Sequence, residues 1–271
     1  SNIQSYYNPY FNSLLNISAY DRATKINKQV TSKFRNNLTY KVDEYYLNII
    51  KESSHANSIL QDLQSKLLIN TSQIISVANR FVLYQLYEEA LSCYIFLEEN
   101  YPNLPDYSMQ IAHLYESLGN DQEMINRYLL SIKKEPNKRS MVIYYLQRYL
   151  DNNGIKNEDN FNYVRHGLLE YANVEKEGYF FSDILVWFFI LDQEYELAFA
   201  QSKAIDLRNG LDGEKIYELG ETLLDKKEYS VALKCFNYLI SKGIDNYYYL
   251  EANINRLYSI ENLEYFNIQN L

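Results

Sequence analysis

The sequence predicts an all-α fold, a solenoid of antiparallel helical hairpins that repeat about every 34 residues. Pro102 and Pro136 are 34 residues apart, and each follows a stretch with helical periodicity. The pattern Tyr-x-x-Ala-Leu-x-Cys-aromatic occurs at 87–94 and again at 229–236. The chain has only 8 Gly and 4 Pro, fewer turn residues than a β-sandwich or barrel of 271 residues needs.

The length and the net charge of the chain disfavour several classes of protein. A chain of 271 residues is near the limit of one compact core, but in a solenoid each repeat packs only on its neighbours. The net charge of −9 disfavours nucleic-acid binding. We interpret the basic residues around Pro136 (Lys133, Lys134, Lys138 and Arg139) as a solvated patch at a turn between helices. No apolar run is long enough to predict a transmembrane helix.

A common register runs through the helical segments. Small residues recur in the first helix of a hairpin, and a small residue followed by an aromatic recurs in the second. The small residues of the first helices are Ala78, Ala112 and Gly220, and the aromatic residues of the second helices are Tyr94, Tyr128 and Phe236. This register, with Pro102 and Pro136 at its end, resembles the tetratricopeptide repeat (TPR) family. The resemblance implies repeats at 71–104, 105–138, 179–212 and 213–246, a variant hairpin at 139–178 and a partial repeat at 247–271.

The resemblance implies a right-handed α-solenoid, in which TPR-type hairpins form an α-α superhelix. We expect residues 1–70 to be a degenerate helical N-terminal segment or capping helices, and residues 1–40 show no register of their own. The chain ends inside a repeat, so we expect a segment of a longer protein. The arrangement is similar to uncharacterised multi-repeat TPR proteins of the bacterial envelope, which favours a periplasmic or outer-membrane-associated location over the cytoplasm.

The residue types that carry chemistry do not form a recognisable catalytic set. His55, His113 and His166 have no partner at metal-ligand spacing. Cys93 and Cys235 occupy the same place in distant repeats, so we expect helix-packing thiols and no disulfide between them. Glycine-rich phosphate loops are absent, and paired carboxylates such as Glu88 and Glu89 fit exposed helical positions. We therefore expect no enzyme, no cofactor and no metal site.

The register also predicts a binding surface. In proteins of this type one face of each first helix lines a concave groove. That face contains Asn79, His113, Gln147, Asp183, Trp187, Ile190, Tyr217, Glu221 and Asn255. Trp187, the single tryptophan, has two interpretations. It anchors a partner's helix or peptide, or its very apolar helix is buried by the irregular hairpin before it.

Two functions follow from this surface. The first is a non-catalytic scaffold that binds another protein's peptide or helix in the groove. The second is a glycan- or nutrient-binding envelope protein on a TPR frame, in which some of the 29 tyrosines stack on sugars. Core packing and compositional bias are simpler explanations of the tyrosines.

Overall fold

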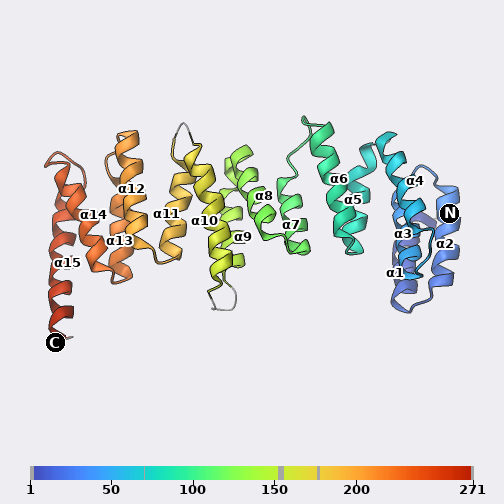
Figure 1. Cartoon of the computed structure of the whole chain (residues 1–271), viewed down its shortest axis with the longest axis horizontal. Helices are drawn as coiled ribbons and strands as arrows, with labels where there is room; N and C mark the ends of the chain where they lie inside the picture. Colours follow the sequence, from blue (N-terminus) through green and yellow to red (C-terminus); the bar gives the residue numbers. More distant parts are fainter. Residues whose placement is uncertain (1–2, 70, 152–155, 176–177, 270–271) are drawn as a thin grey trace. The chain divides into compact units, whose positions relative to one another are not determined.

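The protein is all-α, with helices packed as sequential antiparallel pairs, as the sequence predicts (Figure 1). The computed structural model describes residues 3–69, 71–151, 156–175 and 178–269. These ranges hold fifteen α-helices and two short 3₁₀ turns, Thr71–Gln73 and Pro136–Lys138. The chain forms two compact units that divide after Lys138. No helix in the described ranges is long and apolar enough to cross a membrane.

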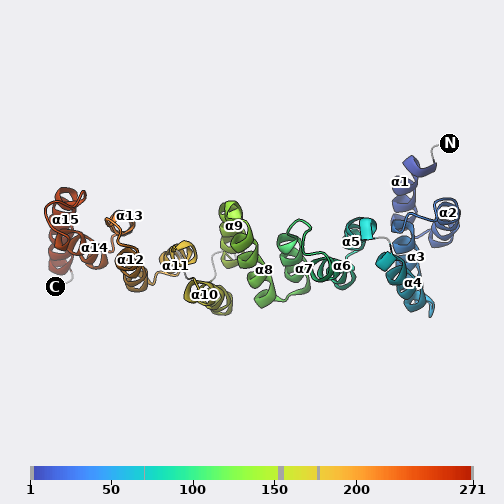
Figure 2. The ribbon, with the colours of Figure 1, turned by 90° about the horizontal axis from the view of Figure 1, so that it is seen from above.

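The first unit contains eight helices. They are α1 (Ile3–Asn16), α2 (Tyr20–Lys33), α3 (Thr39–Ile50), α4 (Ala56–Ile69), α5 (Ile74–Leu83), α6 (Tyr87–Asn100), α7 (Ser108–Leu118) and α8 (Asp121–Lys134). Residues 3–69, for which the sequence shows little register, thus form two further antiparallel pairs (Figure 2). The first pair buries Tyr7, Phe11 and Leu14 of α1 against Ala23 and Val30 of α2.

The second unit contains the other seven helices. They are α9 (Arg139–Leu150), α10 (Glu158–Asn173), α11 (Phe180–Leu191), α12 (Tyr195–Asn209), α13 (Glu214–Asp225), α14 (Tyr229–Ser241) and α15 (Tyr249–Gln269). The polar stretch 151–160 is helical at its end, because α10 begins at Glu158. The Asn157 side chain accepts hydrogen bonds from the backbone N–H groups of Asp159 and Asn160, which caps the helix. Residues 152–155 lie outside the described ranges.

The turns inside the hairpins repeat with the same backbone geometry. Gln85, Gly119, Gln193 and Lys227 all have φ between 60° and 69°, and each lies between the two helices of a pair. A left-handed residue at this point ends the first helix and reverses the chain. The 34-residue spacing is therefore a repeat of backbone geometry as well as of residue type.

The hairpin cores use the residues that the register predicts. Tyr94, Tyr128 and Phe236 of the second helices are buried, as are Cys93 and Cys235. The second helix of the variant hairpin buries Phe161, Val164 and Leu168. Leu169 of the same helix is exposed.

A charged network lies inside the first unit, and no sequence motif pointed to it. The Asp43 side chain is fully buried and accepts hydrogen bonds from Arg80 at 2.6 and 2.8 Å. The hydroxyls of Tyr7 and Tyr84 donate to the same carboxylate at 2.8 and 2.5 Å. Asn27 donates to the Tyr7 hydroxyl. The network joins α1, α2, α3 and α5, and it satisfies the buried charge on all sides.

The basic residues around Pro136 form ion pairs with acidic side chains. Lys134 lies 3.2 Å from Glu98 and 2.9 Å from Asp106. Lys138 lies 2.7 Å from Glu135 and 3.6 Å from Asp106. The expected solvated basic patch is thus largely neutralised by its own neighbours, since a paired lysine presents little net charge to a phosphate.

Candidate partner-binding surface

Two of the predicted groove residues are tied to the second helix of their own hairpin. The Tyr94 hydroxyl on α6 donates to Asn79 on α5 at 3.0 Å. The Tyr128 hydroxyl on α8 lies 3.0 Å from Nδ1 of His113 on α7, and the two rings meet edge to face. The spacing is the same in both hairpins, so this bond is a repeated structural element. Asn79 and His113 therefore help to fix the hairpin.

On α9 and α11 the predicted residues differ in their surroundings. Gln147 is exposed and Ile190 is half-buried. Asp183 is only 14% exposed and pairs with Arg139 at 2.5 Å and with Lys215 at 3.7 Å. Asp183 thus connects α9, α11 and α13 through charge, which gives it a structural role in the second unit.

Trp187 lies half-buried on α11. Its neighbour Phe188 is fully buried, with its ring 5.9 Å from that of Phe161 on α10 and with the Arg165 guanidinium 6.0 Å from its centre. The apolar side chains of α11 thus pack largely against α10. The partial exposure of Trp187 leaves part of the indole open to a partner.

The other three predicted residues come together on α13 and α15. The Tyr217 side chain on α13 interacts with Glu221, one turn further along, and with Asn255 on α15. The Tyr217 ring stacks on that of Tyr248, with centroids 4.8 Å apart and planes at 22°. We call the five residues Tyr217, Glu221, Tyr248, Glu251 and Asn255 the acidic tyrosine patch.

The electrostatics of the patch are negative. Burial raises the pKa of Tyr217, and the hydrogen bond to Glu221 and the charge of that carboxylate raise it further, whereas Asn255 has the opposite effect. Burial also raises the pKa of Tyr248, and the carboxylates of Glu214, Glu218 and Asp212 add to the shift. Several carboxylates thus act on the stacked rings of Tyr217 and Tyr248, although Glu218 is paired with Lys215 at 3.3 Å. Such a surface attracts cations both by charge and through the ring faces.

The second helix of the α13–α14 hairpin explains why the Glu221 carboxylate is available to a partner. Glu221 occupies the position of Asn79 and His113, and Phe236 occupies that of Tyr94 and Tyr128. A phenylalanine has no hydroxyl, so the bond across the hairpin does not form here. Glu221 instead interacts with Tyr217 and stays exposed. The sequence contained this signal in the change from Tyr to Phe, but the meaning of the change depends on the bond seen in the other hairpins.

The His, Cys, Asp and Glu side chains of the described ranges do not gather into a metal-binding cluster. No group of three or more His, Cys, Asp or Glu side chains there could hold a metal ion. Burial raises the pKa of both Cys93 and Cys235 to about 12, so neither thiol is ionised near neutral pH. His166 is 67% exposed, with Glu170 at 3.8 Å as its ion-pair partner.

Comparisons with known proteins give a likeness of fold only. No family model matches the chain, and no curated protein matches it. Among solved structures, a chain of a Naa15/Naa10 complex bound to HypK-THB matches 96% of this chain, at 12% identity and a TM-score of 0.37. The chain spans 39% of that chain's length. TTC0263, a thermophilic TPR protein of Thermus thermophilus, matches 70% of this chain at 15% identity and a TM-score of 0.32, with 98% of its own length covered.

Proposed function

We propose that the protein is a non-catalytic scaffold that binds a peptide or helix of another protein on the face formed by its first helices. The acidic tyrosine patch is the single observation that carries the proposal. It brings Tyr217, Glu221 and Asn255 together from two helices, and the stacked Tyr248 extends it. The partner segment is accordingly basic, with a Lys or Arg side chain over the tyrosine rings.

The chemistry of the patch supports a basic partner for two reasons. A guanidinium or ammonium over a tyrosine face gains about 0.5–2 kcal/mol, depending on how far it is desolvated. Carboxylates around the rings raise the local concentration of positively charged segments and speed their association. The overall charge of −9 acts in the same direction.

Trp187 is a second contact in this proposal. It belongs to the same unit as the patch and lies on a first helix, α11, as Tyr217 does on α13. Partly exposed tryptophans are frequent anchors at the centre of protein interfaces.

The test is affinity capture of the full-length protein from its own cells, followed by mass spectrometry. We expect a defined protein partner whose recovery falls with Tyr217→Ala and with Glu221→Gln, and whose binding weakens as salt is raised. Tyr163→Ala is the matched control, because Tyr163 is an exposed tyrosine of α10, a second helix of the same unit. Equal recovery by the Tyr217, Glu221 and Tyr163 variants would exclude the patch as the binding surface.

Glycan binding is the alternative, and the exposed rings favour it. Tyr247, 82% exposed, meets Tyr248 edge to face beside the Tyr217 stack, and such open rings suit stacking on sugars. A glycan array separates the two functions, since a glycan ligand would bind without protein partners and with little dependence on salt. The envelope location is a proposal from the resemblance alone, and fractionation of cells that express the complete reading frame tests it.

A further inference from the structure

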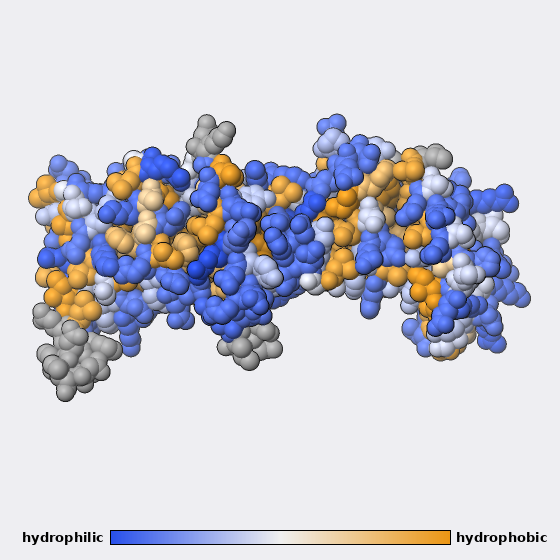
Figure 3. All heavy atoms as spheres, in the orientation of Figure 1, coloured by the Kyte–Doolittle hydropathy of each residue, from blue (hydrophilic) through white to orange (hydrophobic). Residues whose placement is uncertain are grey.

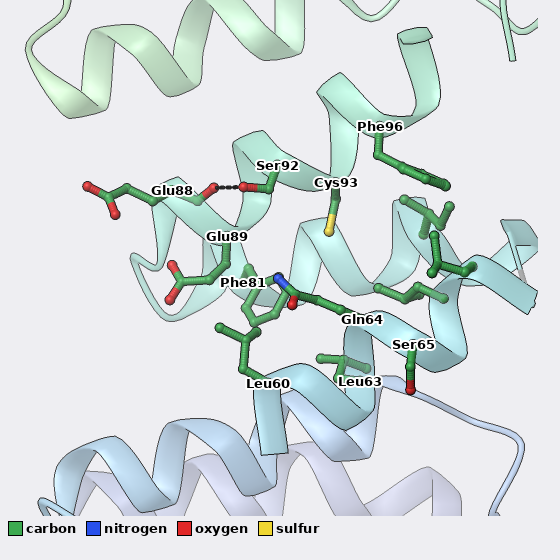
Figure 4. A pocket seen from close by; sticks show the side chains of 13 residues that line it. Leu60, Leu63, Gln64, Ser65, Phe81, Glu88, Glu89, Ser92, Cys93 and Phe96 are labelled. Atoms are coloured by element: carbon green, nitrogen blue, oxygen red, sulfur yellow. Dashed lines mark hydrogen bonds between the residues drawn. The ribbon is translucent and has the colours of Figure 1, made fainter. Parts of the chain in front are cut away.

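A pocket of about 560 Å³ lies between α4 and α6 in the first unit, with α5 as its floor (Figure 4). It opens because α4 packs on α3 and approaches α5 and α6 at few points. Its volume is within the range of about 300–1,000 Å³ typical of small-molecule sites. The surface view shows hydrophobic residues gathered over this part of the unit (Figure 3).

The inner wall of the pocket is apolar and preformed. Leu63 of α4, Ile74 and Phe81 of α5 and Cys93 of α6 line it, and each is less than 10% exposed. These side chains belong to the hydrophobic core of the unit, so their positions do not depend on an occupant. An apolar body that enters the pocket would remove the remaining apolar surface from water.

One end of the pocket is acidic. Glu89, near the start of α6, lies at this end, and the side chain of the neighbouring Glu88 points outward from it (Figure 4). Phe96 and Ser65 lie at the other end. Tyr45 donates its hydroxyl to Glu89 at 2.7 Å, which leaves the carboxylate with free acceptor capacity.

No cation neutralises this end. Within the part of the chain that the structure describes, neither Glu88 nor Glu89 forms an ion pair, and no Lys or Arg lines the pocket. An anion would therefore meet only repulsion at this end, whereas a protonated amine would gain a charged partner.

We propose that this pocket binds a small amphipathic organic cation, with an apolar body against Leu63, Phe81 and Cys93 and a protonated amine at Glu89, where the charge of Glu88 adds to the attraction. The site is separate from the acidic tyrosine patch, since it lies wholly in the first unit. Its existence does not depend on the proposed scaffold function.

The test compares three probes that share one apolar body: 4-phenylbutylamine, 4-phenylbutanol and 4-phenylbutyrate. Calorimetry on the full chain at neutral pH measures their affinity. We expect saturable 1:1 binding of the amine, about tenfold or more tighter than the alcohol, because a charge-assisted hydrogen bond replaces a neutral one. The carboxylate should bind most weakly.

Two kinds of variant locate the site. The double variant Glu88→Gln with Glu89→Gln should lower the affinity for the amine to that for the alcohol. Glu99→Gln is the control, because Glu99 is an exposed acid of α6 outside the pocket, and this variant should leave the affinity for the amine unchanged. Ser92→Trp places a large ring at the pocket wall and should abolish binding of all three probes. Circular dichroism confirms that each variant keeps its helices.

Three results would overturn the proposal. The first is equal affinity of the amine and the carboxylate, and the second is binding of the amine that Ser92→Trp leaves unchanged. The third is failure of all three probes to bind.

Discussion

The Phe236 ring lies against the backbone of Gly220, so close that a Cβ on this glycine would be 2.8 Å from two ring carbons. Gly220 is on α13 and Phe236 on α14, and both are buried. The same Cβ would lie 3.3 Å from Cβ of Cys235. The absent side chain therefore sets how closely the two helices of this hairpin pack.

Gly220→Ala should destabilise the second unit. Overpacking of a core typically costs about 1–3 kcal/mol. The better helix propensity of alanine offsets ~0.5–1 kcal/mol of that cost. Urea unfolding, followed by circular dichroism, measures the difference. In a Phe236→Leu background the cost of Gly220→Ala should shrink, and an unchanged cost would show that the ring is not the obstacle.

Tyr128→Phe should lower the stability of the first unit through the loss of the bond to His113. A typical hydrogen bond contributes about 0.5–1.5 kcal/mol, and the ring of phenylalanine keeps the packing. Tyr115→Phe is the control, because Tyr115 lies on the same hairpin and its hydroxyl has no hydrogen bond within the described residues. Equal costs for the two substitutions would mean that the Tyr128 hydroxyl contributes nothing specific.

Asp43→Asn should be the most damaging of these substitutions. Asp43 is fully buried, and its loss of charge leaves the Arg80 guanidinium without its ion-pair partner. The removal of one member of a buried pair typically costs about 3–5 kcal/mol. The measurement is the midpoint and the free energy of urea unfolding.

Two controls separate burial from charge in that experiment. Asp21→Asn breaks the pair with Lys51 at the surface and should have no measurable effect, since Asp21 is fully exposed. Arg80→Met combined with Asp43→Asn should recover part of the loss, because no unpaired charge remains. A double variant as unstable as the sum of both single variants would contradict this account.

Acid should weaken the contacts between α6 and α8. Burial opposes the ionisation of Glu98 and of Asp106, but the hydrogen bonds and charges of their partners outweigh it, so the pKa of each is lowered. The partners are Arg127 and Lys134 for Glu98, and Ser108 and Lys134 for Asp106. Their stabilising contribution is present above the unfolded pKa of about 4 and is lost as the pH falls through the lower folded values.

Urea unfolding between pH 7 and pH 3 measures this dependence. We expect a flatter profile below about pH 4 for Glu98→Gln with Asp106→Asn than for the parent protein, because the titrating groups are gone. Glu99→Gln, which lies beside Glu98 but is exposed, serves as the control. A parallel loss of stability in the double variant would show that other carboxylates govern the acid response.

Local patterns in the sequence were sufficient to predict the helical pairs and much of the core. The apolar face of a helix is encoded by spacing along the chain, which is why the burial of Tyr94, Tyr128 and Cys235 could be predicted. The close approach at Gly220 could be predicted for the same reason, since only a small residue fits between two packed helices. Residues 3–33 carry no such register, so the sequence predicted helical structure there but not the two helices and their bounds, which only the structure gave.

By itself, then, the sequence determined the helical class, the hairpin period and the faces that are buried, because these depend on contacts close along the chain. The tertiary structure decided how polar side chains from different helices meet. Asp43 pairs with Arg80 across two helices. Glu221 interacts with Tyr217 instead of with the second helix of its hairpin, and a pocket lies between α4 and α6. These features depend on distances between helices, and residue spacing within one helix does not encode those distances.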